Sequence, residues 1–174
     1  SPTEKQLVAR ANAGDHGALE TLYEQQRDWA TAVAYGFLGN REDALDVLQD
    51  TFIYFFGKFP GFELTSSLRS FLYPAIKHRS ISLIRKRRKV VDLDAYRKGG
   101  EEPMFRPPAG DFERIVAPLP PGQREVVTLR FAFDFRLNEI ADALGIPVGT
   151  VKSRLHNALK SLHSGLHSEL RQVE

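Results

Sequence analysis

The chain of 174 residues contains no cysteine, one tryptophan and one methionine. Without cysteine it can form neither a disulfide nor a thiolate metal site, and a reducing, cytoplasmic location fits that composition. No apolar run approaches the roughly 20 residues needed to cross a bilayer. Residues 1–10 also lack the apolar core of a secretory signal. The sequence therefore predicts a protein without a membrane span.

Sequence signatures of catalysis are missing as well. The chain has no P-loop, no dinucleotide-binding glycine pattern and no nucleophile elbow. Its five histidines are scattered. His163 and His167 are spaced to share a helix face, but no third ligand joins them, so two exposed histidines are the simpler interpretation. We expect no enzyme, no metal, no cofactor and no small-molecule substrate.

The hydrophobic pattern is helical along most of the chain, with no sustained strand alternation. It fades between residues 91 and 111, where glycine and proline pairs punctuate a polar stretch. The pattern predicts an all-α protein of two small helical domains, residues 1–90 and 112–174, joined by a flexible linker at 91–111.

Helix boundaries can be predicted in the first domain. Asp15 and Gly39 are suited to begin and end one helix, and Asn40 to cap the next. The apolar side of that next helix runs to Phe59, before a proline–glycine stop. A third helical segment follows, with Pro74 inside it. An interior proline usually kinks a helix, and the pattern leaves open whether this one bends or breaks.

Charge is concentrated although the net charge is only +2. The run from Lys77 to Lys89 (KHRSISLIRKRRK) contains seven Lys and Arg residues and no acid, which is typical either of phosphate binding or of a solvated charge run. Residues 42–50, by contrast, are acidic and would face either solvent or a basic partner. Most aromatic residues between the two segments are expected in the core, with a minority available to stack on unpaired bases.

Residues 139–162 have the pattern of a helix-turn-helix. Gly145 is suited to end a first short helix and Pro147 to start a second. The second helix has a predicted buried stripe of Val151, Leu155, Ala158, Leu159 and Leu162. Its opposite face is polar, with Gly149, Ser153, His156, Asn157 and Lys160, flanked by Lys152 and Arg154. Such a face can contact DNA, although an ordinary helical hairpin has the same pattern.

Taken together, these segments resemble the sigma-70 family, in its extracytoplasmic-function (ECF) group. The resemblance extends over LVARANAGDHGALETLYEQ, REDALDVLQDTF and KFPGF in the first half, followed by SLRSFLYPAIKHRSISLIRKRRK. In the second half it extends over LPPGQREVVTLRF and LNEIADALGIPVGTVKSRLHNALKSL. The chain departs from the usual pattern at Pro74, His78 and Ser82.

The resemblance implies an RNA polymerase sigma factor that directs promoter recognition and melting. Its expected partners are core polymerase, through the clamp of the largest subunit, promoter DNA and an anti-sigma factor. The residues implied for polymerase binding are Asp46, Gln49 and Asp50. Those implied for the −10 element are Thr65, Ser66, Ser67, Lys77, His78, Arg79, Arg85, Arg87 and Arg88, with residues 63–67 as a loop that captures a flipped base. Those implied for the −35 element are Gly149, Thr150, Lys152, Ser153, Arg154 and His156.

Two alternatives remain at this point. A sigma-like decoy would bind an anti-sigma protein but not DNA, and the basic run at Arg85–Lys89 argues against it. A stand-alone helix-turn-helix regulator would bind duplex DNA as a dimer, but it leaves the acidic helix unexplained. Formation of a complex with core polymerase separates a sigma factor from such a regulator.

Overall fold

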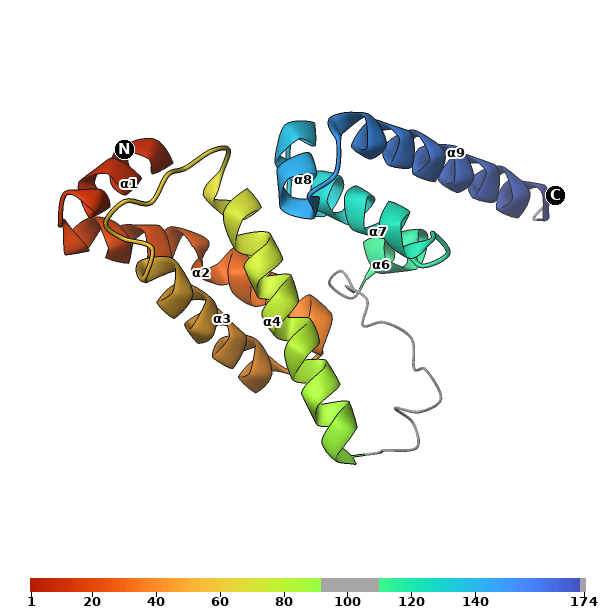
Figure 1. Ribbon diagram of the computed structural model, residues 1–174. Coiled ribbons are helices and arrows are strands. Elements are labelled where there is room, and N and C mark those ends of the chain that lie inside the picture. The colour runs from red at the N-terminus through yellow and green to blue at the C-terminus, as the bar shows by residue number, and fades with distance from the viewer. Residues whose placement is uncertain (92–109, 173–174) are drawn as a thin grey trace. The chain divides into compact units, whose positions relative to one another are not determined.

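The computed structural model describes residues 1–91 and 110–172, and within them every regular element is a helix, as predicted (Figure 1). The chain divides into two compact units, Ser1–Phe105 and Arg106–Glu174. The expected linker lies, apart from its ends, outside the described residues. None of the described helices is long and apolar enough to span a membrane.

The first unit begins with three capped helices, α1 (Glu4–Asn12), α2 (His16–Leu38) and α3 (Arg41–Phe56). The side chains of Asp15 and Asn40 accept hydrogen bonds from backbone N–H groups in the first turns of α2 and α3, as predicted. Gly39 ends α2 in the left-handed conformation, with φ 68°. These caps satisfy N–H and C=O groups that have no partner inside the helix.

The predicted end of α3 is wrong by one turn. The helix stops at Phe56, and the N–H of Phe59 donates to the carbonyl of Phe56 in the turn that follows. The bend lets Phe59 and the buried Phe62 pack against Phe55, with ring centroids 5.2 and 5.3 Å from it. Packing of these rings therefore determines the chain direction more than the apolar period along α3.

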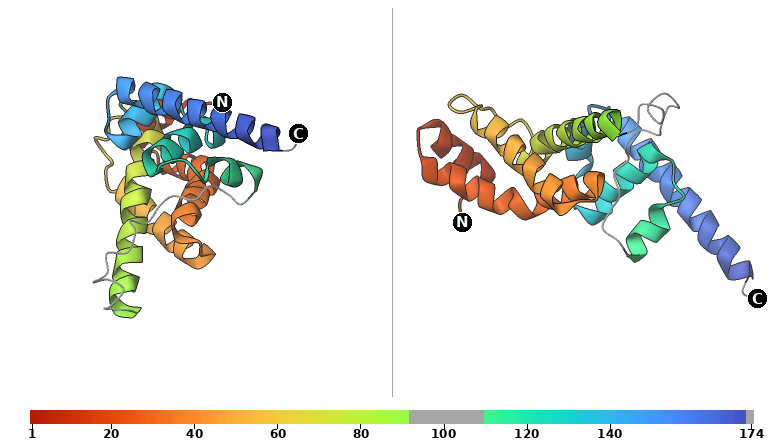
Figure 2. Two further views of the ribbon diagram at one scale, coloured as in Figure 1. Left: turned by 90° about the vertical axis from the view of Figure 1, so that its right-hand side faces the viewer. Right: turned by 90° about the horizontal axis from the view of Figure 1, so that it is seen from below.

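Helix α4 (Leu68–Val91) is one continuous helix (Figure 2), and Pro74 lies inside it. Its first turn is capped by Ser67, whose Oγ accepts from the N–H of Ser70 at 3.1 Å. Pro74 itself is exposed, so its ring meets solvent rather than a neighbouring helix. The basic run and the preceding apolar segment therefore belong to one continuous helix.

Helices α2, α3 and α4 pack on one another and enclose the core of the first unit (Figure 1). Leu22, Val33, Phe55, Leu72 and Tyr73 are fully buried there. Each such large side chain contributes about 1.5–3 kcal/mol through removal from water. The core fixes α3 and α4 as neighbours, and this places the acidic and basic segments of the sequence on adjacent helices.

The second unit contains α6 (Asp111–Val116), α7 (Pro121–Val127), a π-helical turn η1 (Thr128–Ala132), α8 (Leu137–Leu144) and α9 (Val148–Gln172). Helices α7 and α8 pack on α9. The predicted stripe of α9 is buried at Val151, Leu155 and Ala158 but not at Leu159, which is 48% exposed. Leu159 follows Ala158 by one residue and so lies about 100° around the helix from it, at the edge of the buried stripe.

Candidate functional site

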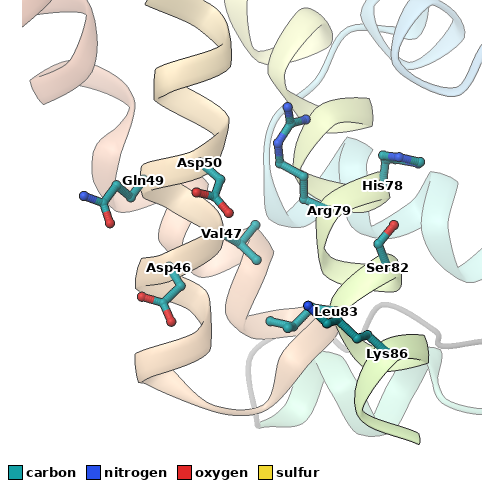
Figure 3. A pocket seen from close by; sticks show the side chains of 9 residues that line it. All are labelled: Asp46, Val47, Gln49, Asp50, His78, Arg79, Ser82, Leu83 and Lys86. Atoms are coloured by element: carbon teal, nitrogen blue, oxygen red, sulfur yellow. The ribbon is translucent and has the colours of Figure 1, made fainter. Parts of the chain in front are cut away.

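An open groove of about 590 Å³ runs between α3 and α4. Figure 3 shows Asp46, Gln49 and Asp50 on the α3 side, and His78, Arg79 and Lys86 on the α4 side. Residues that the family resemblance implies for polymerase binding therefore line the same groove as residues that it implies for the −10 element. The α3 wall carries two carboxylates and the α4 wall carries cationic side chains, so the two walls of the groove have opposite charge.

The acidic side of the groove has the orientation that the sequence predicted. Asp46, Gln49 and Asp50 are exposed, whereas Leu48 and Phe52 on the opposite side of α3 are buried. Two large apolar side chains, Leu45 and Ile53, are exposed one turn before and one turn after Gln49, and Ile53 is 63% exposed. This outer face of α3, residues 45, 46, 49, 50 and 53, combines acidic and apolar groups.

Next to the groove, Tyr54 is the centre of a cation–aromatic stack. The guanidinium of Arg79 lies 4.6 Å from its ring centroid and the ammonium of Lys58 lies 4.8 Å away. The ring also stacks on Phe71 at 6.1 Å, with an interplanar angle of 6°. Arg79 is thus held in place by Tyr54 and is half-buried, while its neighbour His78 is exposed.

The basic run at the end of α4 is exposed from Arg85 to Lys89, and within it Arg87 makes an ion pair with α3. Its two terminal nitrogens donate to both carboxylate oxygens of Asp43 in the first turn of that helix. The Asp43 side chain is only 7% exposed, whereas that of Arg87 is 55% exposed. Arg87 therefore joins the end of α4 to the start of α3, a role that the sequence did not predict.

The segment before α4 contains the predicted −10 loop residues. Thr65 is exposed, and Ser66 and Ser67 are half-buried. The Ser67 hydroxyl is engaged at the start of α4, since it lies 2.9 Å from that of Ser70 and accepts from the Ser70 N–H. Thr65 and Ser66 are therefore better placed than Ser67 to meet a ligand.

The second unit has the geometry of a helix-turn-helix. Gly145 ends α8 at φ 64°, and the N–H of Ile146 donates to the carbonyl of Ala141 at 3.1 Å. On α9, Gly149, Lys152, Ser153 and His156 are exposed on one face. Thr150 and Arg154 are half-buried, and Arg154 lies against Gly122 at the start of α7. The exposed face thus contains four of the six predicted −35 residues, and the other two lie at its edge.

Family models match both units in chain order. The model of Sigma-70 region 2 matches residues 22–90, and that of Sigma-70, region 4 matches residues 109–162. The chain is also 31% identical over 141 residues to the ECF RNA polymerase sigma factor EcfG of Rhodopseudomonas palustris, covering 78% of each chain. The chain belongs to the sigma-70 family. It is an RNA polymerase sigma factor of the ECF group, a class of transcription initiation factors.

Other relatives agree with this assignment. The sigma factor is 27% identical to the ECF RNA polymerase sigma factor SigW of Bacillus subtilis, over 93% of its own length and 96% of SigW. Among solved structures it is similar to CnrH in complex with the cytosolic domain of CnrY. That likeness has a TM-score of 0.65 and 25% identity, and covers 93% and 96% of the two chains. It is also similar to the sigma factor RpoE in complex with the anti-sigma factor NepR from Bartonella quintana, with a TM-score of 0.61, 26% identity and coverage of 85% and 96%.

Sequence reasoning missed two features of this sigma factor. The first is the burial of Asp43, which was grouped with the exposed acidic residues of α3. Asp43 precedes the buried Val47 by one turn and so lies on the same helix face. That spacing could have indicated its burial. The second is Asn12 at the end of α1, whose side chain bonds to Gly61 and Phe62. No local pattern indicates a contact across 49 or 50 residues.

Proposed function

We propose that the outer face of α3 binds the clamp of the polymerase's largest subunit through Asp46, Gln49 and Asp50. The flanking Leu45 and Ile53 support a protein partner, because exposed apolar groups beside charges are typical of interaction surfaces. The carboxylates would select a basic surface on the clamp. This face is separate from the core contacts that hold α3 in its bundle.

Promoter contacts are assigned to two other surfaces. We infer that the loop at residues 63–67 and the exposed side of α4 hold the −10 region, with Thr65, Ser66, Lys77, His78 and Arg79 nearest the melted strand. Arg85, Arg88 and their basic neighbours would neutralise phosphates. The exposed face of α9 would enter the major groove at the −35 element, where small residues near its start allow close approach.

The observation that carries this proposal is the shared groove between α3 and α4. The carboxylates proposed to bind polymerase and the cations proposed to bind the promoter lie on adjacent helices of one bundle. Binding of core polymerase would therefore place the basic side of α4 at a defined distance from the clamp. A stand-alone regulator needs no such coupling, and a decoy needs no basic wall.

An anti-sigma factor is the proposed regulator. Among the similar structures, the sigma factor RpoE is in complex with the anti-sigma factor NepR, and we propose a partner of the same class here. The proposed domains are residues 1–90 and 112–174, joined by a linker at 91–111. Because it would act on bacterial polymerase and DNA, this factor would work in the cytoplasm and without catalytic activity of its own.

Run-off transcription with core polymerase on a genomic promoter library tests the proposal. We expect the purified chain to form a 1:1 complex with core polymerase and to direct transcripts from a subset of promoters that share −10 and −35 sequences. Binding to core polymerase without any promoter-specific transcript would contradict the promoter assignments.

A further inference from the structure

The segment between α3 and α4 is held at both ends by side chains of α1. At one end, the Asn12 Oδ1 accepts from the N–H groups of Gly61 and Phe62 at 2.8 and 3.0 Å. The Asn12 Nδ2 donates to the carbonyl of Phe62 at 2.9 Å. One amide thus makes three hydrogen bonds to two consecutive residues and fixes the backbone direction where Gly61 turns at φ 99°.

At the other end, Glu4 holds the first residue of α4. Its Oε2 accepts from the N–H of Leu68 at 3.1 Å, where a carboxylate also favours the positive end of the helix dipole. Its Oε1 accepts from the buried Gln26 of α2 at 3.2 Å. Gln26 in turn accepts from Nε of Arg69 at 3.0 Å, so α1, α2 and α4 are joined by one chain of bonds.

Five residues, Glu63 to Ser67, lie between these two attachments. Glu63 and Thr65 are exposed, and Leu64 and Ser66 are half-buried. Phe62, just before them, is anchored in the aromatic cluster, 4.8 Å from the ring of Phe71. The short span has fixed ends, so few backbone conformations remain to it before any ligand arrives, and this lowers the entropic cost of binding.

We propose that Asn12 and Glu4 are positioning residues that preset the loop at residues 63–67 for one unpaired base. The inference rests on the proposed function, in which this loop captures a base of the −10 element. The loop side chains touch the base, while Asn12 and Glu4 act through the backbone of residues 61, 62 and 68. Their removal should widen the range of bases that the loop accepts.

The test uses the full chain with core polymerase and single-stranded −10 oligonucleotides that carry each of the four bases at each position. In the wild type, the best and worst base at the captured position should differ about tenfold or more in affinity. Asn12→Ala should remove most of that difference. Asn12→Asp keeps an acceptor for the two N–H groups but loses the bond to the Phe62 carbonyl, so it should give an intermediate difference. Affinity for core polymerase should be unchanged in both.

Asn40→Ala is the matched control, because Asn40 also hydrogen-bonds the backbone near a helix end but makes its bond at the start of α3. It should destabilise the same unit and leave base discrimination intact. Equal discrimination by wild type, Asn12→Ala and Asn12→Asp would overturn the inference, as would an equal loss in Asn40→Ala. A different result would contradict the proposed base capture itself: either the wild type does not discriminate between bases, or Thr65→Ala and Ser66→Ala leave its discrimination unchanged.

Discussion

The first unit is linked by side-chain hydrogen bonds between residues far apart in the sequence, and the second contains several between residues close together. In the first unit, Asn12, Glu4 and Arg87 bond to residues 22 to 64 positions away and link α1, α2, α3 and α4. In the second, the bonds of Arg124, Thr128, Arg130 and Ser153 reach residues four to seven positions away. The long-range bonds fix α1, α3 and α4 relative to one another in the first unit, whereas the exposed face of the second unit lies on the single helix α9.

The largest expected effect is a loss of core polymerase affinity when the charge on the outer face of α3 is reversed. Asp50→Lys should weaken core polymerase binding by about 2–5 kcal/mol, because a new cation would meet a basic surface. The unfolding temperature should change little, since Asp50 is exposed. Competition pull-down against the wild type measures the affinity. Glu20→Lys, an exposed acid on α2 away from the groove, is the matched charge reversal, and equal losses for both would remove the assignment of the α3 face.

The next largest expected effect is the loss of stability when the ion pair between Asp43 of α3 and Arg87 of α4 is removed. Arg87→Ala leaves the Asp43 carboxylate buried without its bidentate partner, and we expect a loss of about 1–3 kcal/mol in the free energy of unfolding. The single tryptophan, Trp29, is buried in α2, so its fluorescence reports the unfolding of this unit alone. Lys89→Ala, which removes an exposed cation two residues further along α4, is the control, with an expected change within about 0.5 kcal/mol. Indistinguishable unfolding curves for the two variants would show that the pair contributes no stability.

A third prediction concerns the second unit and the exposed face of α9. Ser153→Ala and His156→Ala should change the preferred −35 sequence by roughly 1–3 kcal/mol at the affected base pair. Because both side chains are exposed on α9, stability should be nearly unchanged. Holoenzyme binding to a set of −35 variants measures the preference. A uniform loss on every variant would mean that α9 does not read the sequence, even though the protein is a sigma factor.

The same contrast in reach explains what could be predicted from the sequence. The caps at Asp15 and Asn40, the turn at Gly145 and the exposed face of α9 all depend on residues within about one turn of each other, which periodicity detects. The Asp43–Arg87 pair and the Asn12 contacts depend on how α1, α3 and α4 pack together. A spacing of 44 or 50 residues carries no such information. The end of α3 was misplaced for the same reason, because the aromatic core rather than the apolar period decides where the chain turns.

The smallest expected effect is on the salt dependence of DNA affinity, and it distinguishes phosphate contacts from recognition of the base sequence. Arg88 and Lys89 are exposed at the end of α4, and such cations displace counterions from phosphates regardless of base sequence. Replacing both with Ala should lower affinity by a similar factor on every promoter. It should also flatten the slope of log affinity against log salt by about 0.9 for each phosphate that the variant no longer neutralises. Arg87 is left intact in this variant, because its replacement would also disturb the ion pair with Asp43.

Ser153→Ala supplies the matched comparison, since it removes an uncharged side chain from the reading face of α9. Its salt slope should equal that of the wild type while its promoter ranking changes. Holoenzyme affinities for several promoters over a series of salt concentrations give both quantities from one set of titrations. If the Arg88 and Lys89 variant instead reorders the promoters without changing the slope, the end of α4 reads base sequence. The division between an α4 end that holds the DNA by charge and an α9 face that reads it by hydrogen bonds would then be wrong.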